Sequence, residues 1–111
     1  MNDSPRRVPE PLRFDWDAGN AEKSWERHGV RGHECEEVFF GRPLLMLDDP
    51  GHSRSESRHF ALGKTRTGRR LFVAFTVRGE RLRVISARDM SRRERRIHDQ
   101  AAPAQVDPEV R

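Results

Sequence analysis

The stretch LFVAFTVRGERLRVISAR, residues 71–88, decides the fold. Residues 71–77 are apolar at nearly every position, which is typical of a central strand with both faces buried. A turn at Gly79 and Glu80 separates them from a second strand over residues 82–88, in which apolar and polar side chains alternate. Two strands joined by so short a turn predict an antiparallel hairpin.

The alternation in the second strand divides its side chains between two faces. One face is expected to carry Leu82, Val84, Ser86 and Arg88. An arginine on a core-side face needs either a carboxylate partner or a function. We therefore consider two roles for Arg88, an ion pair with Glu94 and the binding of a phosphate group.

A further strand is expected just before the hairpin, over residues 58–65. Phe60 lies on one of its sides, and His59 shares the other with Ala61 and Gly63. Because these two neighbours are small, the pattern predicts a shallow strip that a nucleic-acid backbone can approach. The competing interpretation is that His59 is simply an exposed strand residue.

The remaining elements follow from capping residues and apolar spacing. They are a short strand over residues 12–16, a helix over 18–28 capped by Asp17, a helix over 33–40, a strand over 44–47, and a last helix from the capping box at Ser91 to about Asp99. Together with the hairpin they predict an α+β fold with a small, mostly antiparallel sheet, two N-terminal helices and one C-terminal helix.

The aromatic side chains are expected in the core rather than on a base-stacking surface. In the helix over 18–28, Trp25 shares one face with Ala18, Ala21 and His28, and Trp16 alternates within the first strand. The phenylalanines at core-like positions are Phe39, Phe60, Phe72 and Phe75.

The 111 residues suit one domain, which we expect over residues 12–100 between flexible tails at 1–11 and 101–111, both rich in proline. No apolar run is long enough to span a membrane, and no secretion signal is visible. The lone Cys35 has no disulfide partner within the chain and is expected in the core, which favours a reducing, cytoplasmic setting.

The charges are segregated along the chain. The formal net charge is +4, but residues 54–96 carry a net +10, whereas residues 1–53 carry a net −4. Only Lys23 and Lys64 of the 22 cations are lysines, and the others are arginines, which bind phosphate oxygens with two parallel hydrogen bonds. Genome composition is a competing explanation for the excess of arginine. The segregation favours a polyanionic partner, most simply nucleic acid.

The sequence lacks the motifs of several common catalytic and binding sites. The five histidines and one cysteine do not have the spacing of a zinc site, no glycine-rich phosphate loop is present, and no nucleophile elbow surrounds a serine. We therefore expect neither a metal nor a cofactor.

A basic sheet surface without a metal can bind RNA, or cleave it by attack of the ribose 2′-hydroxyl on the adjacent phosphorus. Cleavage requires proton carriers and cations that stabilise the charge on the phosphoryl oxygens. Arginine meets the second need but is a poor base, so His59 and His98 are the candidate proton carriers. Binding of RNA without chemistry, and docking of an acidic protein partner, remain as alternatives.

An ordered set of short motifs resembles the BrnT family of bacterial toxins from type II toxin–antitoxin systems. The set comprises Phe14-Asp15-Trp16-Asp17, His28-Gly29-Val30, Val38-Phe39 with Pro43, Glu56-Ser57-Arg58, Gly63, Gly68-Arg69-Arg70-Leu71, Val84-Ile85-Ser86-Ala87-Arg88 and Glu94-Arg95-Arg96. The resemblance implies a RelE-like ribonuclease fold, metal-independent RNA cleavage that inhibits translation, and neutralisation by a BrnA-like antitoxin. The ribbon-helix-helix domain of that antitoxin binds operator DNA, so the toxin reaches DNA only through its partner.

The resemblance and the residue analysis together give the candidate site. The expected catalytic residues are Arg58, His59, Lys64, Arg88 and His98, and the expected RNA-binding residues are Arg69, Arg70, Arg83, Arg92, Arg95 and Arg96. Of these, Arg58, Lys64, Arg70, Arg88 and Arg95 match basic positions of the family near the RNA surface. Two positions depart from the family pattern, because Gly32 replaces an aromatic or apolar residue and His98 stands where tyrosine is frequent.

Overall fold

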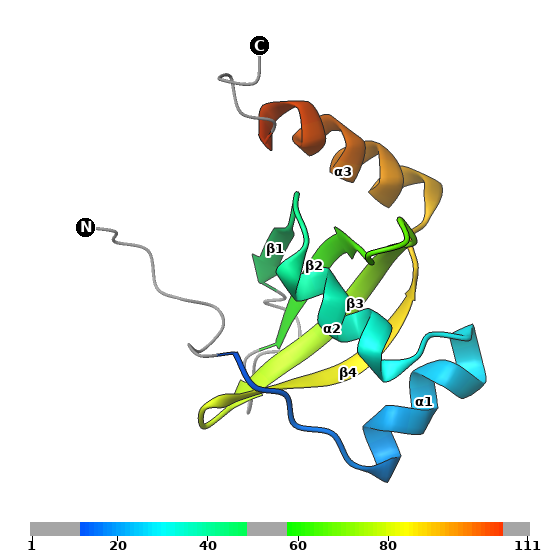
Figure 1. Cartoon of the computed structure of the whole chain (residues 1–111), viewed down its shortest axis with the longest axis vertical. Coiled ribbons are helices and arrows are strands. Elements are labelled where there is room, and N and C mark those ends of the chain that lie inside the picture. The colour runs from blue at the N-terminus through cyan, green and yellow to red at the C-terminus, as the bar shows by residue number, and fades with distance from the viewer. Residues whose placement is uncertain (1–11, 49–57, 106–111) are drawn as a thin grey trace.

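Four antiparallel strands form one sheet, and they lie side by side in the order in which they follow along the chain. The computed structural model describes residues 12–48 and 58–105 (Figure 1). Its elements are α1 (Ala18–His28), α2 (Gly32–Phe40), β1 (Leu45–Asp48), β2 (Arg58–Lys64), β3 (Arg70–Arg78), β4 (Arg81–Asp89) and α3 (Arg92–Gln105). The predicted α+β class, with two N-terminal helices and one C-terminal helix, is confirmed.

The predicted hairpin is confirmed as β3 and β4, but its pairing is interrupted by a bulge. Phe75 pairs with Val84, whereas the preceding Ala74 pairs with Ser86, so Ile85 has no partner on β3. An extra residue on one strand reverses the alternation of side chains beyond it.

The prediction that Arg88 shares a face with Leu82 and Val84 is therefore wrong. Leu82 and Val84 are buried in the core, and Ala87 takes the next core position. Ser86 and Arg88 lie on the other face of the sheet. The bulge thus removes Arg88 from the core side, where an unpaired charge carries a large desolvation penalty.

The core lies between the sheet and α2, which Figure 1 shows in front of β2 and β3. Cys35, Val38 and Phe39 are its α2 members, as predicted. Packing here is so close that a methyl group on Gly63 would lie 2.8 Å from Val38 Cγ1. The predicted strip is therefore not open to nucleic acid at its Gly63 end, because α2 fills the space there.

Helix α1 lies beside β4 and turns an unexpected face inward (Figure 1). The amide of Asn20 donates to the Val84 carbonyl, and the Ser24 hydroxyl accepts from the Ala87 N–H. These bonds satisfy the backbone of an edge strand, so the buried residues of α1 are polar. The expectation that Trp25 packs in the core is wrong, because 48% of it is exposed and Arg31 stacks on its ring.

The N-terminal strand expected over residues 12–16 is reduced to one isolated parallel bridge between Phe14 and Leu82. Trp16 packs against the core as predicted, and its indole N–H donates to Glu36 Oε2 at 2.7 Å. The chain before α1 thus covers the start of the β4 edge without forming a fifth full strand in the described residues.

Helix α3 starts with the predicted capping box, in which the Ser91 N–H donates to Glu94 and the Glu94 N–H donates to Ser91 Oγ. It continues to Gln105, beyond the predicted end near Asp99 and into the stretch expected to be a tail. Of the helices that the structure describes, none has the length and apolarity to cross a membrane.

The sheet face opposite α2 carries three of the expected site residues, Arg58, Arg83 and Arg88. We call it the arginine face, and its side chains are Arg58, Phe60, Leu62, Phe72, Ala74, Thr76, Arg83, Ser86 and Arg88. Phe60 and Phe72 are only partly buried there, with ring centroids 4.8 Å apart, so the expectation that both belong to the main core is wrong. The arrangement follows from the strict alternation of β2 and β3, which places Phe75 in the core and Phe72 outside it.

Candidate nucleic-acid interface

Four cations from four elements surround a cavity of about 250 Å³ at one end of the arginine face. They are Lys23 of α1, Arg58 of β2, Arg78 of β3 and Arg83 of β4. The sequence predicted Arg58 and Arg83 but missed Lys23 and Arg78. Lys23 comes here only because Asn20 and Ser24 attach α1 to the edge of β4, and no spacing in the sequence indicates that contact.

Two of these cations differ in how firmly they are held. The Arg83 guanidinium is 3.0 Å from Asp17 and 3.6 Å from Asp15, and only 17% of its side chain is exposed. The Asn20 backbone N–H, and after it Arg83, lower the pKa of Asp17. Arg58 has no hydrogen bond or ion pair with any residue that the structure describes, so its donors are available to a ligand.

Arg88 lies further along the arginine face and is paired with a carboxylate. Its Nη1 and Nη2 lie 2.8 and 2.9 Å from the two Glu94 oxygens, and its guanidinium carbon lies 4.1 Å from the Phe72 ring centroid. The pairing with Glu94 that we considered from the sequence is therefore confirmed. Through this ion pair Arg88 lowers the pKa of Glu94, and Glu94 raises that of Arg88.

This ion pair predicts a pH dependence of stability. Because the pKa of Glu94 is lower in the folded than in the unfolded protein, its contribution is present above the ordinary glutamate pKa of about 4.3 and is lost as the pH falls through the lowered value. We expect Glu94→Gln to be less stable than the parent at neutral pH, and the difference to shrink below about pH 4. Urea unfolding of both proteins at several pH values measures this. A pH-independent difference would contradict the assignment.

Arg69, expected to bind RNA, is held by partners within the fold. It lies 2.7 Å from Asp89 and 3.2 Å from Glu34, and it also donates to the carbonyls of His28 and Gly29. Arg69 is the first cause of a lowered pKa at Asp89. These contacts join the end of α1, α2 and β4, which is a structural role.

A second cavity, of about 440 Å³, contains two of the predicted RNA-binding residues, Arg70 and Arg95. Arg70 also lies 3.2 Å from Asp99 on α3. Arg92 and Arg96 are exposed on α3. The described structure thus divides the predicted cations between the two ends of β4, and Arg88 lies at the end of β4 next to the second cavity.

The two expected proton carriers are in different surroundings, and neither shares a face with Arg58. His59 lies on the opposite side of β2, with Nδ1 2.9 Å from Asp48 Oδ1 and its ring 5.3 Å from that of Phe75. Its side chain remains 15% exposed. His98 is only 2% exposed, and its Nε2 is bonded to the Pro43 carbonyl at 3.0 Å, so this ring has no path to a bound RNA in the described structure.

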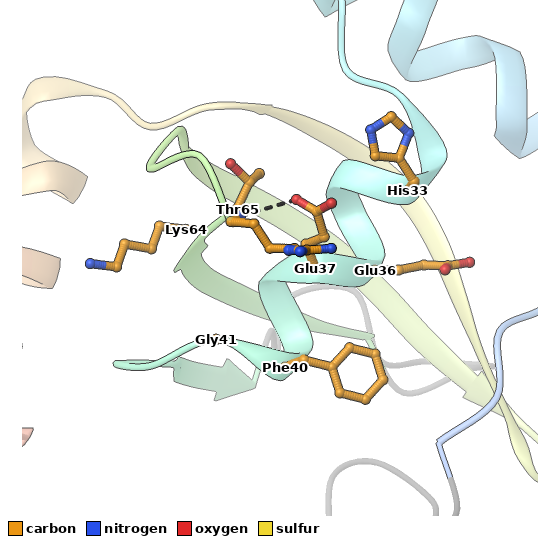
Figure 2. Close-up of a pocket in the computed structure, with 8 residues that line it drawn as sticks. His33, Glu36, Glu37, Phe40, Gly41, Lys64 and Thr65 are labelled. Carbon is orange, nitrogen blue, oxygen red and sulfur yellow. Dashed lines mark hydrogen bonds between the residues drawn. The ribbon is translucent and has the colours of Figure 1, made fainter.

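Lys64 is at the other end of β2 from Arg58, roughly 20 Å away along a strand of seven residues. It lines a third cavity, of about 540 Å³, between α2 and the turn that follows β2. Figure 2 shows its ammonium group pointing away from His33 and Glu36. The Glu37 carboxylate accepts the Arg66 backbone N–H at 3.0 Å in the same cavity (Figure 2). This cavity is separate from the arginine face.

The remaining reactive side chain, Cys35, is buried as expected. Burial, followed by the charges of Glu34 and Glu36, raises the pKa of its thiol to about 12. A thiol in this state is a poor nucleophile near neutral pH. Among residues 12–48 and 58–105, no group of three His, Cys, Asp or Glu side chains is placed to hold a metal ion.

Comparison with known proteins agrees with the motifs in the sequence. No curated protein gives a significant match. The model of the family described as "Ribonuclease toxin, BrnT, of type II toxin-antitoxin system" matches residues 16–94, which include α1, α2, all four strands and the first turn of α3. The chain therefore belongs to the BrnT family of ribonuclease toxins.

Proposed function

We propose that this protein is a metal-independent endoribonuclease that binds RNA on the arginine face and inhibits translation by cleaving it. One observation carries the proposal. In a chain from a family of ribonuclease toxins, Lys23, Arg58, Arg78 and Arg83 surround a single cavity on the sheet. A phosphodiester group there would meet cations from four elements.

The proposed reaction needs no group beyond the chain and the RNA. The ribose 2′-oxygen bonds to the adjacent phosphorus, the bond from phosphorus to the 5′-oxygen breaks, and a 2′,3′-cyclic phosphate remains. The proton from the 2′-hydroxyl goes to a base, and the leaving 5′-oxygen receives one from an acid. Arg58 stabilises the charge on the phosphoryl oxygens, because its donors have no partner among the described residues, while Arg83 is already oriented by Asp15 and Asp17.

We assign proton transfer to His59 and not to His98. His59 is partly exposed, and Asp48 at its Nδ1 orients the ring and leaves Nε2 as the nitrogen that exchanges a proton. His59 directly follows Arg58, so RNA that crosses the start of β2 would reach both side chains.

The proposed protein partner is a BrnA-like antitoxin with a ribbon-helix-helix domain. The toxin would contact operator DNA only through this antitoxin, and both would act in the cytoplasm. Family membership supports an antitoxin partner. An acidic antitoxin segment would complement the cations of the arginine face and block access of RNA.

A second candidate function is RNA binding without cleavage. It is favoured by one observation, namely that the described part of the arginine face contains no histidine. A basic sheet without a proton carrier binds RNA but does not cleave it. Binding that weakens steeply with salt, without new RNA ends, would support this function.

The deciding experiment uses the full chain purified free of antitoxin. We expect it to cleave single-stranded RNA in the presence of a chelator and to leave 2′,3′-cyclic phosphate ends. The chelator arm tests metal independence, and the end analysis tests attack by the 2′-hydroxyl. Uncut RNA with a folded sample over a range of salt concentrations would refute cleavage.

A further inference from the structure

The guanidinium of Arg88 lies over an aromatic ring on the arginine face. Its central carbon is 4.1 Å from the centroid of Phe72, and the Phe60 ring continues the apolar surface at 4.8 Å from Phe72. The ring covers one face of the guanidinium, yet 37% of the Arg88 side chain is exposed. More than a third of this side chain is therefore accessible to a ligand.

The edge of the Arg88 guanidinium that normally binds a phosphate is already bonded to Glu94. Both terminal nitrogens donate to Glu94, and Nη1 also donates to the Asp89 carbonyl at 3.1 Å. A bidentate phosphate contact would have to displace a carboxylate whose pKa is lowered by this same arginine. Among the described residues, Phe72 is the one ring over which the Arg88 guanidinium lies, and guanidinium planes stack on nucleobases.

The sheet continues from Arg88 toward the cationic cavity in rows of paired residues. The neighbouring row of the sheet places Ala74 beside Ser86, which are small residues, and Phe60 closes the row on β2. The next row contains Arg58 and Arg83, about 13 Å from the Arg88 row along the strands. An aromatic plane, a step formed by small side chains and a cationic cavity thus follow one another along one face.

We propose that an unpaired nucleobase stacks on the outer face of the Arg88 guanidinium, so that Arg88 reads a base while the cavity around Arg58 holds a phosphate of the same strand. The assignment rests on the proposed RNA function and adds its substrate class, single-stranded RNA. Bases inside a duplex are already stacked on their neighbours and cannot lie on a protein surface without being extruded, so a duplex is excluded. Glu94 is a positioning residue here, because it fixes the guanidinium plane against Phe72.

The test measures stacking without cleavage. The probes are short single-stranded 2′-O-methyl oligonucleotides, which lack the attacking hydroxyl, with the fluorescent base 2-aminopurine at each position in turn. We expect binding of the full chain to quench the fluorescence at one position, and removal of the base at that position to weaken binding about tenfold. The same sequence in a duplex is expected to bind more weakly and without the quenching.

Variants distinguish a stacking plane from a simple charge. Arg88→Lys keeps the charge but removes the plane, so we expect it to lose the quenching and about tenfold in affinity, as Arg88→Gln does. The matched control is Arg31→Gln, because Arg31 stacks on Trp25 at 4.2 Å outside the arginine face, and it should leave binding unchanged. Full affinity and quenching in Arg88→Lys, or equal binding of the oligonucleotide without the base, would overturn the proposal. Because the probes cannot be cleaved, this test is independent of the proposed ribonuclease activity. A protein that cuts no RNA can still show base stacking on Arg88, and a ribonuclease can lack it.

Discussion

Replacing Arg58 by alanine is expected to slow RNA cleavage by about a hundredfold to a thousandfold while leaving the fold intact. The rate falls because Arg58 supplies donors to the charge that develops on the phosphoryl oxygens, and loss of one such donor typically has this effect. Stability should change little, because Arg58 makes no ion pair or hydrogen bond with a described residue. Single-turnover cleavage of a defined RNA, together with urea unfolding, measures both quantities.

Two variants make the Arg58 result specific. Arg58→Lys keeps the charge but not the bidentate geometry, so it should recover only part of the rate. Arg27→Ala removes an exposed cation of α1 that lies outside both cationic cavities, and this variant should cleave at the parental rate. If a folded Arg58→Ala protein cleaves as fast as the parent, the cavity is not where the phosphate reacts.

Replacing His59 by glutamine is expected to slow cleavage by about a hundredfold or more and to remove the histidine limb of the pH–rate profile. General acid–base catalysis contributes at least about this factor, and histidine is the side chain that ordinarily titrates between roughly pH 5 and 8. Glutamine still offers hydrogen-bonding groups near Asp48 but does not exchange a proton in this range. Cleavage rates across that pH range measure the effect.

A structural role for His59 would give a different pattern. The contact with Asp48 also joins β1 to β2, since these two residues are partners in the register of the strands. If the His59→Gln rate falls but the pH profile keeps its shape, or if unfolding shows a parallel loss of stability, His59 supports the sheet and does not transfer the proton. His33→Gln, at an exposed histidine of α2, is the matched control and should behave as the parent.

Local sequence patterns were sufficient for most of the fold. The apolar run of β3, the Gly79 turn and the capping box at Ser91 each act over a few residues, and each element formed where its pattern predicted. The core members of α2 also followed from helical spacing, because Cys35, Val38 and Phe39 face one layer of the sheet.

The side of the sheet on which each side chain lies was predicted less well than the positions of the helices and strands. Strict alternation along β4 placed Arg88 beside Val84, and the bulge at Ile85 moved it to the opposite side. Alternation also grouped His59 with Gly63 correctly, but the prediction that this side is open was wrong at Gly63, because the sequence does not indicate which face α2 covers. The bulge at Ile85 and the position of α2 therefore changed which side chains of the expected site lie together.

The sequence by itself determined the α+β class, the hairpin, the helix starts and the concentration of arginine in residues 54–96, because these depend on short-range geometry and on composition. Only the tertiary structure decided which cations act together. It engaged Arg69 with Asp89 and Glu34, buried His98, and brought Lys23 to the cavity of Arg58. The physical reason is that an edge strand must satisfy its backbone groups, and the residues that do so for β4, Asn20 and Ser24, lie more than sixty positions away in the chain.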